Sequence, residues 1–219
     1  EPTVITYNAA ISACAKGGQW ERALALLDEL SSRGLEPNVI TYTAAISACG
    51  KGGQWKEALT LLDELRSRGL EPNTITYDAA ISACELAREH VHAKDLLKAA
   101  MSERLFSTVW NEEMLDLHDL SAPVARTAVR LALDDMVRRP DERSFHETEN
   151  LGDLVIITGR GKHSDAGEAI LQPAILAMFR DEFAGRLECR EDVRNPGWLV
   201  VPAASLRGWV HQTSKMKQP

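Results

Sequence analysis

The chain has 219 residues, of which 44% are hydrophobic and 26% are charged, a composition typical of a folded globular protein and not of a disordered one. Its 25 Lys and Arg residues against 32 Asp and Glu residues give a net charge of −7, which excludes a protein that holds nucleic acid by bulk charge alone. Four cysteines are too few for the disulfide framework of a small secreted protein. No apolar run approaches the length of a membrane-spanning helix.

Two near-identical segments of 35 residues open the chain. Residues 4–38 and 39–73 agree at 29 of 35 positions, and a third copy that begins at Thr74 has diverged in its second half. One copy alone cannot bury all of its apolar surface, because each copy predicts only a pair of helices. We therefore expect the copies to stack into an α-solenoid of helical hairpins.

The spacing of apolar residues sets the expected helices of the first copy. A first helix is predicted from about Thr6 to Lys16, and a second from about Trp20 to Arg33. Gly17-Gly18 separates the two, and Gly34 suits the position that follows the last turn. By the same repeat register, residues 1–3 are expected to be the end of a preceding, truncated repeat.

Three of the cysteines occupy one repeat position. They are 35 residues apart, at Cys14, Cys49 and Cys84. Stacked repeats place such residues at equivalent points along an axis, which does not bring them together as metal ligands or as a disulfide. They are expected to be small buried residues.

The repeat resembles the pentatricopeptide repeat family. The motifs that carry the resemblance are VITYNAAISAC with its variant VITYTAAISAC, the KGG linker and the closing GLEPN. The resemblance implies single-stranded RNA as the partner, with one base bound per repeat. It also implies that the fifth and last residues of a repeat contact the base edge, while the second residue is an apolar wedge against the base face.

These roles fall on specific residues of this chain. The pair Asn8 and Asn38 resembles the family's pairing for pyrimidines, chiefly cytosine, and Thr43 with Asn73 resembles the pairing for adenine. In the third repeat the fifth residue is Asp78, and no preferred base is assigned to this repeat. The expected wedges and phosphate contacts are Ile5, Ile40, Ile75, Lys16 and Lys51.

The second half of the chain predicts strands that alternate with helices, which is typical of a small α/β domain. Two motifs stand out in it, LDLHDLS at Leu115–Ser121 and TGRGKHS at Thr158–Ser164. If the strands that precede them are parallel, both motifs lie at the carboxyl edge of one sheet, where open α/β sheets bind ligands. The predicted strands are 114–118, 154–158, 186–190 and 198–201, and the predicted helices are 122–139, about 165–183 and 206–210.

These motifs resemble the Smr (small MutS-related) domain, in the form fused to pentatricopeptide repeats in plant and algal organelle proteins. The resemblance implies nuclease chemistry, for which His118 and His163 are candidate acid and base and Asp116 a candidate partner. One departure is Asp119, where bacterial members commonly have Gly, and it disfavours a DNA-nicking activity. The expected phosphate contacts are Gly159, Arg160, Gly161 and Lys162.

The leading hypothesis is therefore an organellar RNA-binding protein, in a chloroplast or mitochondrion, whose Smr domain cleaves or clamps RNA. An adaptor that recruits a protein partner or protects an RNA end is the alternative, and a DNA-directed nuclease is a third. The cofactor stays open, with a divalent cation such as Mg²⁺ as one candidate, and no metal ligands are assigned. The expected fold class is an α-solenoid followed by a small α/β domain with a four-stranded sheet. The expected boundaries are 4–38, 39–73 and 74–108 for the repeats and 110–211 for the Smr domain.

Overall fold

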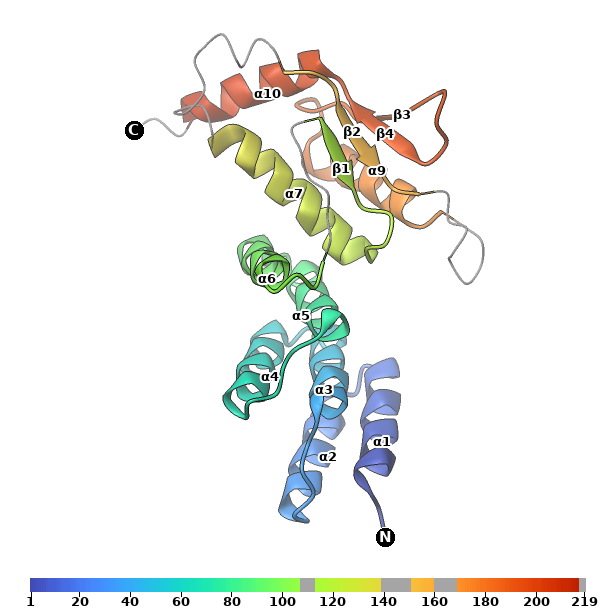
Figure 1. Ribbon diagram of the computed structural model, residues 1–219, viewed down its shortest axis with the longest axis vertical. Coiled ribbons are helices and arrows are strands. Elements are labelled where there is room, and N and C mark those ends of the chain that lie inside the picture. Colours follow the sequence, from blue (N-terminus) through green and yellow to red (C-terminus); the bar gives the residue numbers. More distant parts are fainter. Residues whose placement is uncertain (107–112, 139–150, 160–168, 217–219) are drawn as a thin grey trace. The chain divides into compact units, whose positions relative to one another are not determined.

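The computed structural model describes residues 1–106, 113–138, 151–159 and 169–216 (Figure 1). The chain divides into two compact units, residues 1–106 and residues 107–219.

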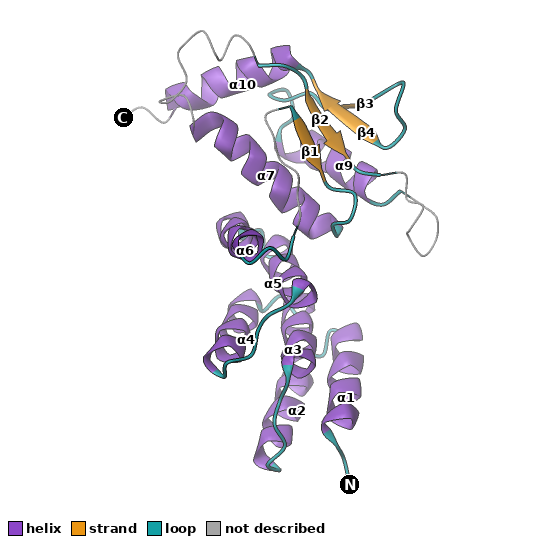
Figure 2. Ribbon diagram, viewed as in Figure 1, coloured by secondary structure: helices purple, strands orange, loops and turns teal. Residues whose placement is uncertain are grey.

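The first unit consists of three helical hairpins, as the sequence predicts. The first helices of the hairpins contact one another in series, α1 with α3 and α3 with α5, and the second helices α2 and α4 pack on the first helix of the next hairpin. This serial stacking is the expected α-solenoid (Figure 2). Every helix has 13 residues: α1 Val4–Lys16, α2 Trp20–Ser32, α3 Val39–Lys51, α4 Trp55–Ser67, α5 Thr74–Leu86 and α6 His90–Ser102.

Polar side chains fix where the first helices begin. Asn38 is the N-cap of α3, and its side chain accepts a hydrogen bond from the Thr41 amide. Asn73 caps α5 in the same way through Thr76. These caps satisfy amide groups that have no partner inside the helix, so α3 and α5 begin at the same point of each repeat.

The core of the solenoid repeats with the sequence. Tyr42 and Tyr77 are fully buried, and burial together with hydrogen bonding to Glu103 raises the pKa of Tyr77 to about 12. The Tyr42 hydroxyl donates to Glu64 of α4 at 2.7 Å, which ties the two helices of the hairpin together. All three repeat cysteines are buried, which confirms the prediction that they are small core residues.

The second unit contains a four-stranded mixed sheet in the order β1-β2-β4-β3. Its strands are β1 Met114–Asp116, β2 Leu154–Ile157, β3 Arg190–Glu191 and β4 Trp198–Val201. β1 and β2 pair in parallel, with Leu115 opposite Ile156, while β4 is antiparallel to both β2 and β3. The strands that precede the two motifs are therefore parallel, as the placement of both motifs at one sheet edge requires.

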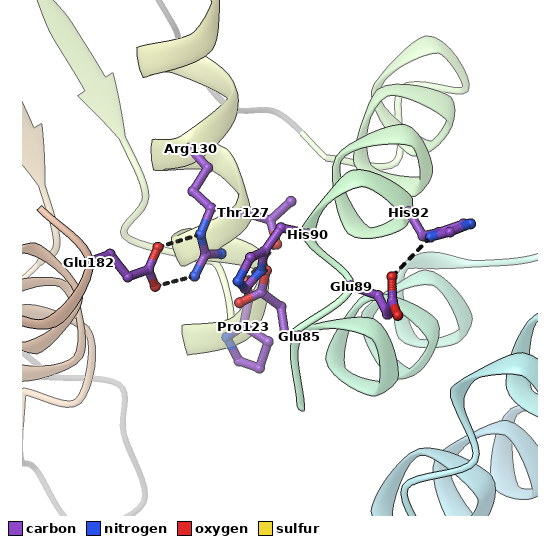
Figure 3. Close-up of polar contacts among 8 residues, drawn as sticks. All are labelled: Glu85, Glu89, His90, His92, Pro123, Thr127, Arg130 and Glu182. Atoms are coloured by element: carbon purple, nitrogen blue, oxygen red, sulfur yellow. Dashed lines mark hydrogen bonds and ion pairs between the residues drawn. The ribbon is translucent and has the colours of Figure 1, made fainter. Parts of the chain in front are cut away.

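Among the described residues of this unit three helices pack together, and α7 contacts both of the others. They are α7 Ala122–Arg138, α9 Leu171–Glu182 and α10 Ala203–Met216. Arg130 of α7 is almost fully buried, and its guanidinium binds the Glu182 carboxylate of α9 with two hydrogen bonds of 2.8 and 2.5 Å (Figure 3). A bidentate pair of this kind fixes orientation as well as distance, so it holds α9 in register with α7.

Three predicted elements differ from the structure. Residues 186–189 are not a strand, because the Arg186 and Leu187 amides close a turn on the Phe183 carbonyl, and β3 is only Arg190–Glu191. The helix expected from about 165 is not continuous to 183: α9 begins at Leu171, since Pro173 lacks an amide hydrogen and is tolerated only in a first turn. The last helix is longer than 206–210 and begins at Ala203.

Residues 165–168, where the predicted helix would begin, lie outside the described residues. Among the helices of the described part of the chain, none has the length and the apolar character that crossing a membrane requires.

Candidate nucleic-acid interface

Three exposed isoleucines mark the second residue of each first helix. Ile5, Ile40 and Ile75 expose 80%, 63% and 68% of their surface, although isoleucine is usually buried. The residue three positions later in each helix, Asn8, Thr43 or Asp78, lies on the same helix face because of the helical period. An apolar side chain and a polar side chain therefore lie side by side in every repeat.

The polar pair of the first repeat is joined by hydrogen bonds. Asn8 Nδ2 donates to Asn38 Oδ1 at 3.4 Å, although the two residues are 30 positions apart. The Thr41 hydroxyl donates to Asn8 Oδ1 at 2.6 Å and lies 3.1 Å from Asn38 Oδ1. The fifth and last residues of this repeat thus form one cluster, with Thr41 beneath them.

The second repeat builds the same cluster from different residues. Thr43 and Thr76 share a hydrogen bond of 2.8 Å between their hydroxyl oxygens. Thr76 Oγ1 in turn donates to Asn73 Oδ1 at 3.1 Å. Thr43 and Asn73 are therefore connected through a single buried hydroxyl group.

The third repeat departs from the other two. Asp78 accepts a hydrogen bond from the Ser82 hydroxyl at 3.1 Å, within its own helix. Exposed lysines end α1 and α3, at Lys16 and Lys51, whereas α5 ends with exposed Leu86. Side-chain cations thus stand at this helix end in the first two repeats only.

Helix α6 carries two histidines with acidic neighbours. His92 Nδ1 lies 3.7 Å from Glu89 Oε2 (Figure 3), and its ring packs at 4.9 Å from that of Trp55. His90 Nδ1 lies 3.3 Å from Glu85 Oε1. His92 is exposed and His90 is half-buried.

In the second unit, the ends of β1 and β2 bring two motifs together. The parallel pairing carries His118 and Gly159 to one edge, and a Cβ atom added to Gly159 would lie 3.3 Å from the His118 Cβ. Gly159 has φ +74°, a conformation that favours glycine. Arg160, Gly161, Lys162 and His163, the rest of the second motif, lie outside the described residues.

Two carboxylates hold the His118 ring. Nδ1 lies 2.6 Å from Asp116 Oδ1, and Nε2 lies 3.0 Å from Asp119 Oδ2. The hydrogen bond to Asp116 and the charges of Asp116 and Asp119 raise the pKa of His118 despite its partial burial. Each ring nitrogen has a carboxylate partner, which favours the protonated imidazolium, and that form of histidine can donate a proton.

Within the described residues there is no cluster of three or more His, Cys, Asp or Glu side chains that could hold a metal ion.

Two features of these sites were missed from the sequence. Thr41 and Thr76 were not singled out, although Asn-x-x-Thr before an apolar run is a recognisable capping signal. Asp119 was noted only as a departure from a motif. Its contact with His118 depends on the turn in which the Leu120 amide binds the Leu117 carbonyl, and no sequence pattern revealed that geometry.

Comparisons with known proteins support the repeat fold. Residues 2–51 and 39–85 match the PPR repeat family. The chain is similar to the crystal structure of the pentatricopeptide repeat protein PPR10 from maize, with 22% identity and a TM-score of 0.54, over 84% of this chain and 23% of that chain. It is also similar to PPR10 in complex with an 18-nt psaJ RNA element, with 21% identity and a TM-score of 0.48, over 67% of this chain and 23% of that chain.

The family match thus lies within the first unit, and the chain spans less than a quarter of the length of PPR10. No curated protein sequence matches the chain. The family match ends at residue 85, before the second unit begins.

Proposed function

We propose that the chain binds single-stranded RNA through its repeat array, with one base contacted by each intact repeat. The observation that carries the proposal is the polar pair beside an exposed isoleucine, which is joined directly in the first repeat and through Thr76 in the second. An unpaired base offers a flat face to an apolar side chain and a polar edge to such a pair. The pentatricopeptide repeat match over the same residues supports this proposal.

Lysines supply the contact to the RNA backbone. Lys16 and Lys51 end α1 and α3 and are exposed. Two lysines neutralise few phosphates, so affinity falls only gently as salt is raised. The third repeat, with Leu86 at this position and Asp78 as its fifth residue, contributes less to binding.

The base preference of the second repeat tests the proposal. Thr43→Asn recreates the pair of the first repeat, and we expect the preferred base to change from adenine to a pyrimidine, by roughly 1–3 kcal/mol of discrimination. The measurement is the affinity for short RNAs that carry each of the four bases at one position. Thr60→Asn is a matched control, because Thr60 lies exposed on α4, outside the first-helix layer. An unchanged preference in Thr43→Asn would reject the assignment.

For the second unit we propose an Smr-type domain that cleaves or clamps the bound RNA. His118 is its central residue, supported by the meeting of His118 and Gly159 at the strand ends. The raised pKa of His118 suits a general acid, which donates a proton to the leaving oxygen of a phosphodiester. Asp116 holds the ring through Nδ1, leaving Nε2 to face the substrate once Asp119 is displaced.

Cleavage is tested with RNA of matched sequence in the presence and absence of Mg²⁺. His118→Ala is expected to slow cleavage by about 10²–10⁴-fold, the usual contribution of acid–base catalysis, without changing which RNA binds. His211→Ala is the control, since His211 is an exposed histidine on α10. A folded His118→Ala protein that cleaves at the wild-type rate would remove His118 from catalysis.

A non-catalytic adaptor is the second candidate. It is favoured by the engagement of both His118 ring nitrogens with carboxylates, which leaves neither nitrogen as a proton acceptor. In this case the wild-type chain leaves cognate RNA intact with every divalent cation tested, and it protects the RNA end from an exonuclease. DNA nicking is the least supported activity, because the repeat array favours a single-stranded RNA partner. We propose a chloroplast or a mitochondrion as the location on the motif resemblance alone.

A further inference from the structure

A buried threonine hydroxyl lies beneath the polar pair of each of the first two repeats. Thr41 and Thr76 have no exposed surface. Each is the third residue of its helix and also belongs to the next repeat in the sequence. Neither can touch a bound base directly, so any influence on base choice passes through the residues above it.

In the first repeat the hydroxyl determines which way the amides point. Thr41 Oγ1 accepts from the Asn38 backbone amide at 3.1 Å, and its single hydrogen goes to Asn8 Oδ1 at 2.6 Å. The Asn8 oxygen therefore faces Thr41, and one of the two Nδ2 hydrogens goes to Asn38 Oδ1. Asn38 Oδ1 also accepts from the Thr41 amide, so the Asn38 amide nitrogen is turned away from Thr41.

The pair thus presents two neighbouring hydrogen-bond donors. Cytosine has two neighbouring acceptors, N3 and O2, on its pairing edge. Guanine and uracil each place an N–H group at the central position, and adenine has only one acceptor there. The orientation set by Thr41 therefore favours cytosine.

In the second repeat the buried hydroxyl joins both residues of the pair. Thr76 Oγ1 lies 3.1 Å from Asn73 Oδ1 and 2.8 Å from Thr43 Oγ1, and either hydroxyl can donate in the second contact. When Thr43 donates to Thr76, Thr43 offers acceptor lone pairs beside the Asn73 amide nitrogen. An acceptor beside a donor matches the amino group and ring nitrogen of adenine, N6 and N1, and also those of cytosine, N4 and N3, and it opposes the keto edges of guanine and uracil.

We propose that Thr41 and Thr76 are specificity-determining residues, which fix the donor and acceptor pattern of the pair above them. This inference rests on the proposed RNA binding of the repeats. It assigns to the third residue of a repeat an effect on the base that the preceding repeat contacts. A residue that only stabilised the helix would change the affinity for all four bases alike.

The test uses the full 219-residue chain and short RNAs that differ at one position. Thr41→Val keeps the shape of the side chain and removes the hydroxyl group. We expect its preference for cytosine at the first-repeat base to fall by about 3–10-fold, the net value of one hydrogen bond, with no change at the second-repeat base. Thr76→Val should show the reverse. Thr41→Ser, which retains the hydroxyl group, should restore the preference.

Thr6→Val is the matched control, because Thr6 holds the same helix position in α1 and its hydroxyl contacts only Thr3 among the described residues. Circular dichroism establishes that each variant is folded, and an unfolded Thr41→Val would leave Thr76→Val to decide the same question. An unchanged base preference in the folded valine variants, or an equal loss for all four bases, would overturn the inference. Absence of RNA binding by the wild-type chain would overturn the RNA-binding proposal together with it, and the wild type alone reveals that result.

Discussion

Replacing Arg88 by glycine should stabilise the third repeat. Arg88 and Arg104 have φ of +60°, and they are the non-glycine residues with positive φ among the described residues. The equivalent residues of the second repeat are Gly53 and Gly69, with φ of +75° and +72°. The third repeat has thus kept the turns of the other repeats after losing the glycines that suit them.

The magnitude follows from the backbone alone. A left-handed conformation costs an L-residue about 1–2 kcal/mol, and glycine removes that cost. The greater freedom of glycine in the unfolded chain offsets about 0.5–1 kcal/mol of the resulting stabilisation. Arg88→Gly should therefore raise the free energy of unfolding by roughly 0.5–1 kcal/mol. Arg104→Gly should add a similar amount, since α6 separates the two turns by about 20 Å.

The assay is hydrogen exchange of the α5 and α6 amides in the full chain, because local opening reports the stability of one repeat. Gly53→Arg is the reverse control. A Cβ atom added at Gly53 would meet nothing within 4 Å, so any loss of stability there comes from the backbone conformation and not from crowding. Equal or faster exchange in Arg88→Gly would refute the reasoning.

Three further predictions concern packing, a thiol and a histidine. Gly50→Ala should reduce stability by roughly 1 kcal/mol in urea unfolding, because the new Cβ would lie 2.8 Å from the Ala83 Cβ and crowding outweighs the gain in helix propensity. The Cys84 thiol, whose pKa burial raises to about 12, should resist alkylation at pH 8 until the chain unfolds, and rapid labelling of the native protein would contradict this. Asp119→Asn should lower the pKa of His118 in an NMR titration. The raised pKa of His118 stabilises the folded chain at pH below 6.5, the ordinary histidine pKa, and this stabilisation is lost as pH rises through the pKa of the folded state. Asp119→Asn should therefore also weaken the pH dependence of stability.

The solenoid was predictable because its information is local and repeated. The helical period recurs in each copy and the Gly-Gly break recurs in the first two, and the structure has the hairpins where these signals predict them. The strained turn at Arg88 could also be predicted from the sequence, since the repeat register aligns Arg88 with Gly18 and Gly53. The roles of Thr41 and Thr76 were not, because they depend on hydroxyl contacts between neighbouring repeats.

The second unit was harder to predict because its strands are short. The alternation of Leu187 and Cys189 with polar residues imitates a strand, yet Leu187 is buried within a turn that follows α9. Parallel pairing of β1 and β2 followed from strands separated by one helix, and it correctly brought the His118 and Gly159 segments to one edge. The ring contact between His118 and Asp119 needed the geometry of the turn itself.

The most direct test of the account compares the affinity of the full chain for single-stranded RNA with its affinity for the duplex of the same sequence. Fluorescence anisotropy over a range of salt concentrations gives both values. We predict tighter binding of the single strand, because the exposed isoleucines and polar pairs require an unpaired base. We also predict a shallow dependence of affinity on salt, because few lysines line the array. Equal affinity for the single strand and the duplex would contradict the account.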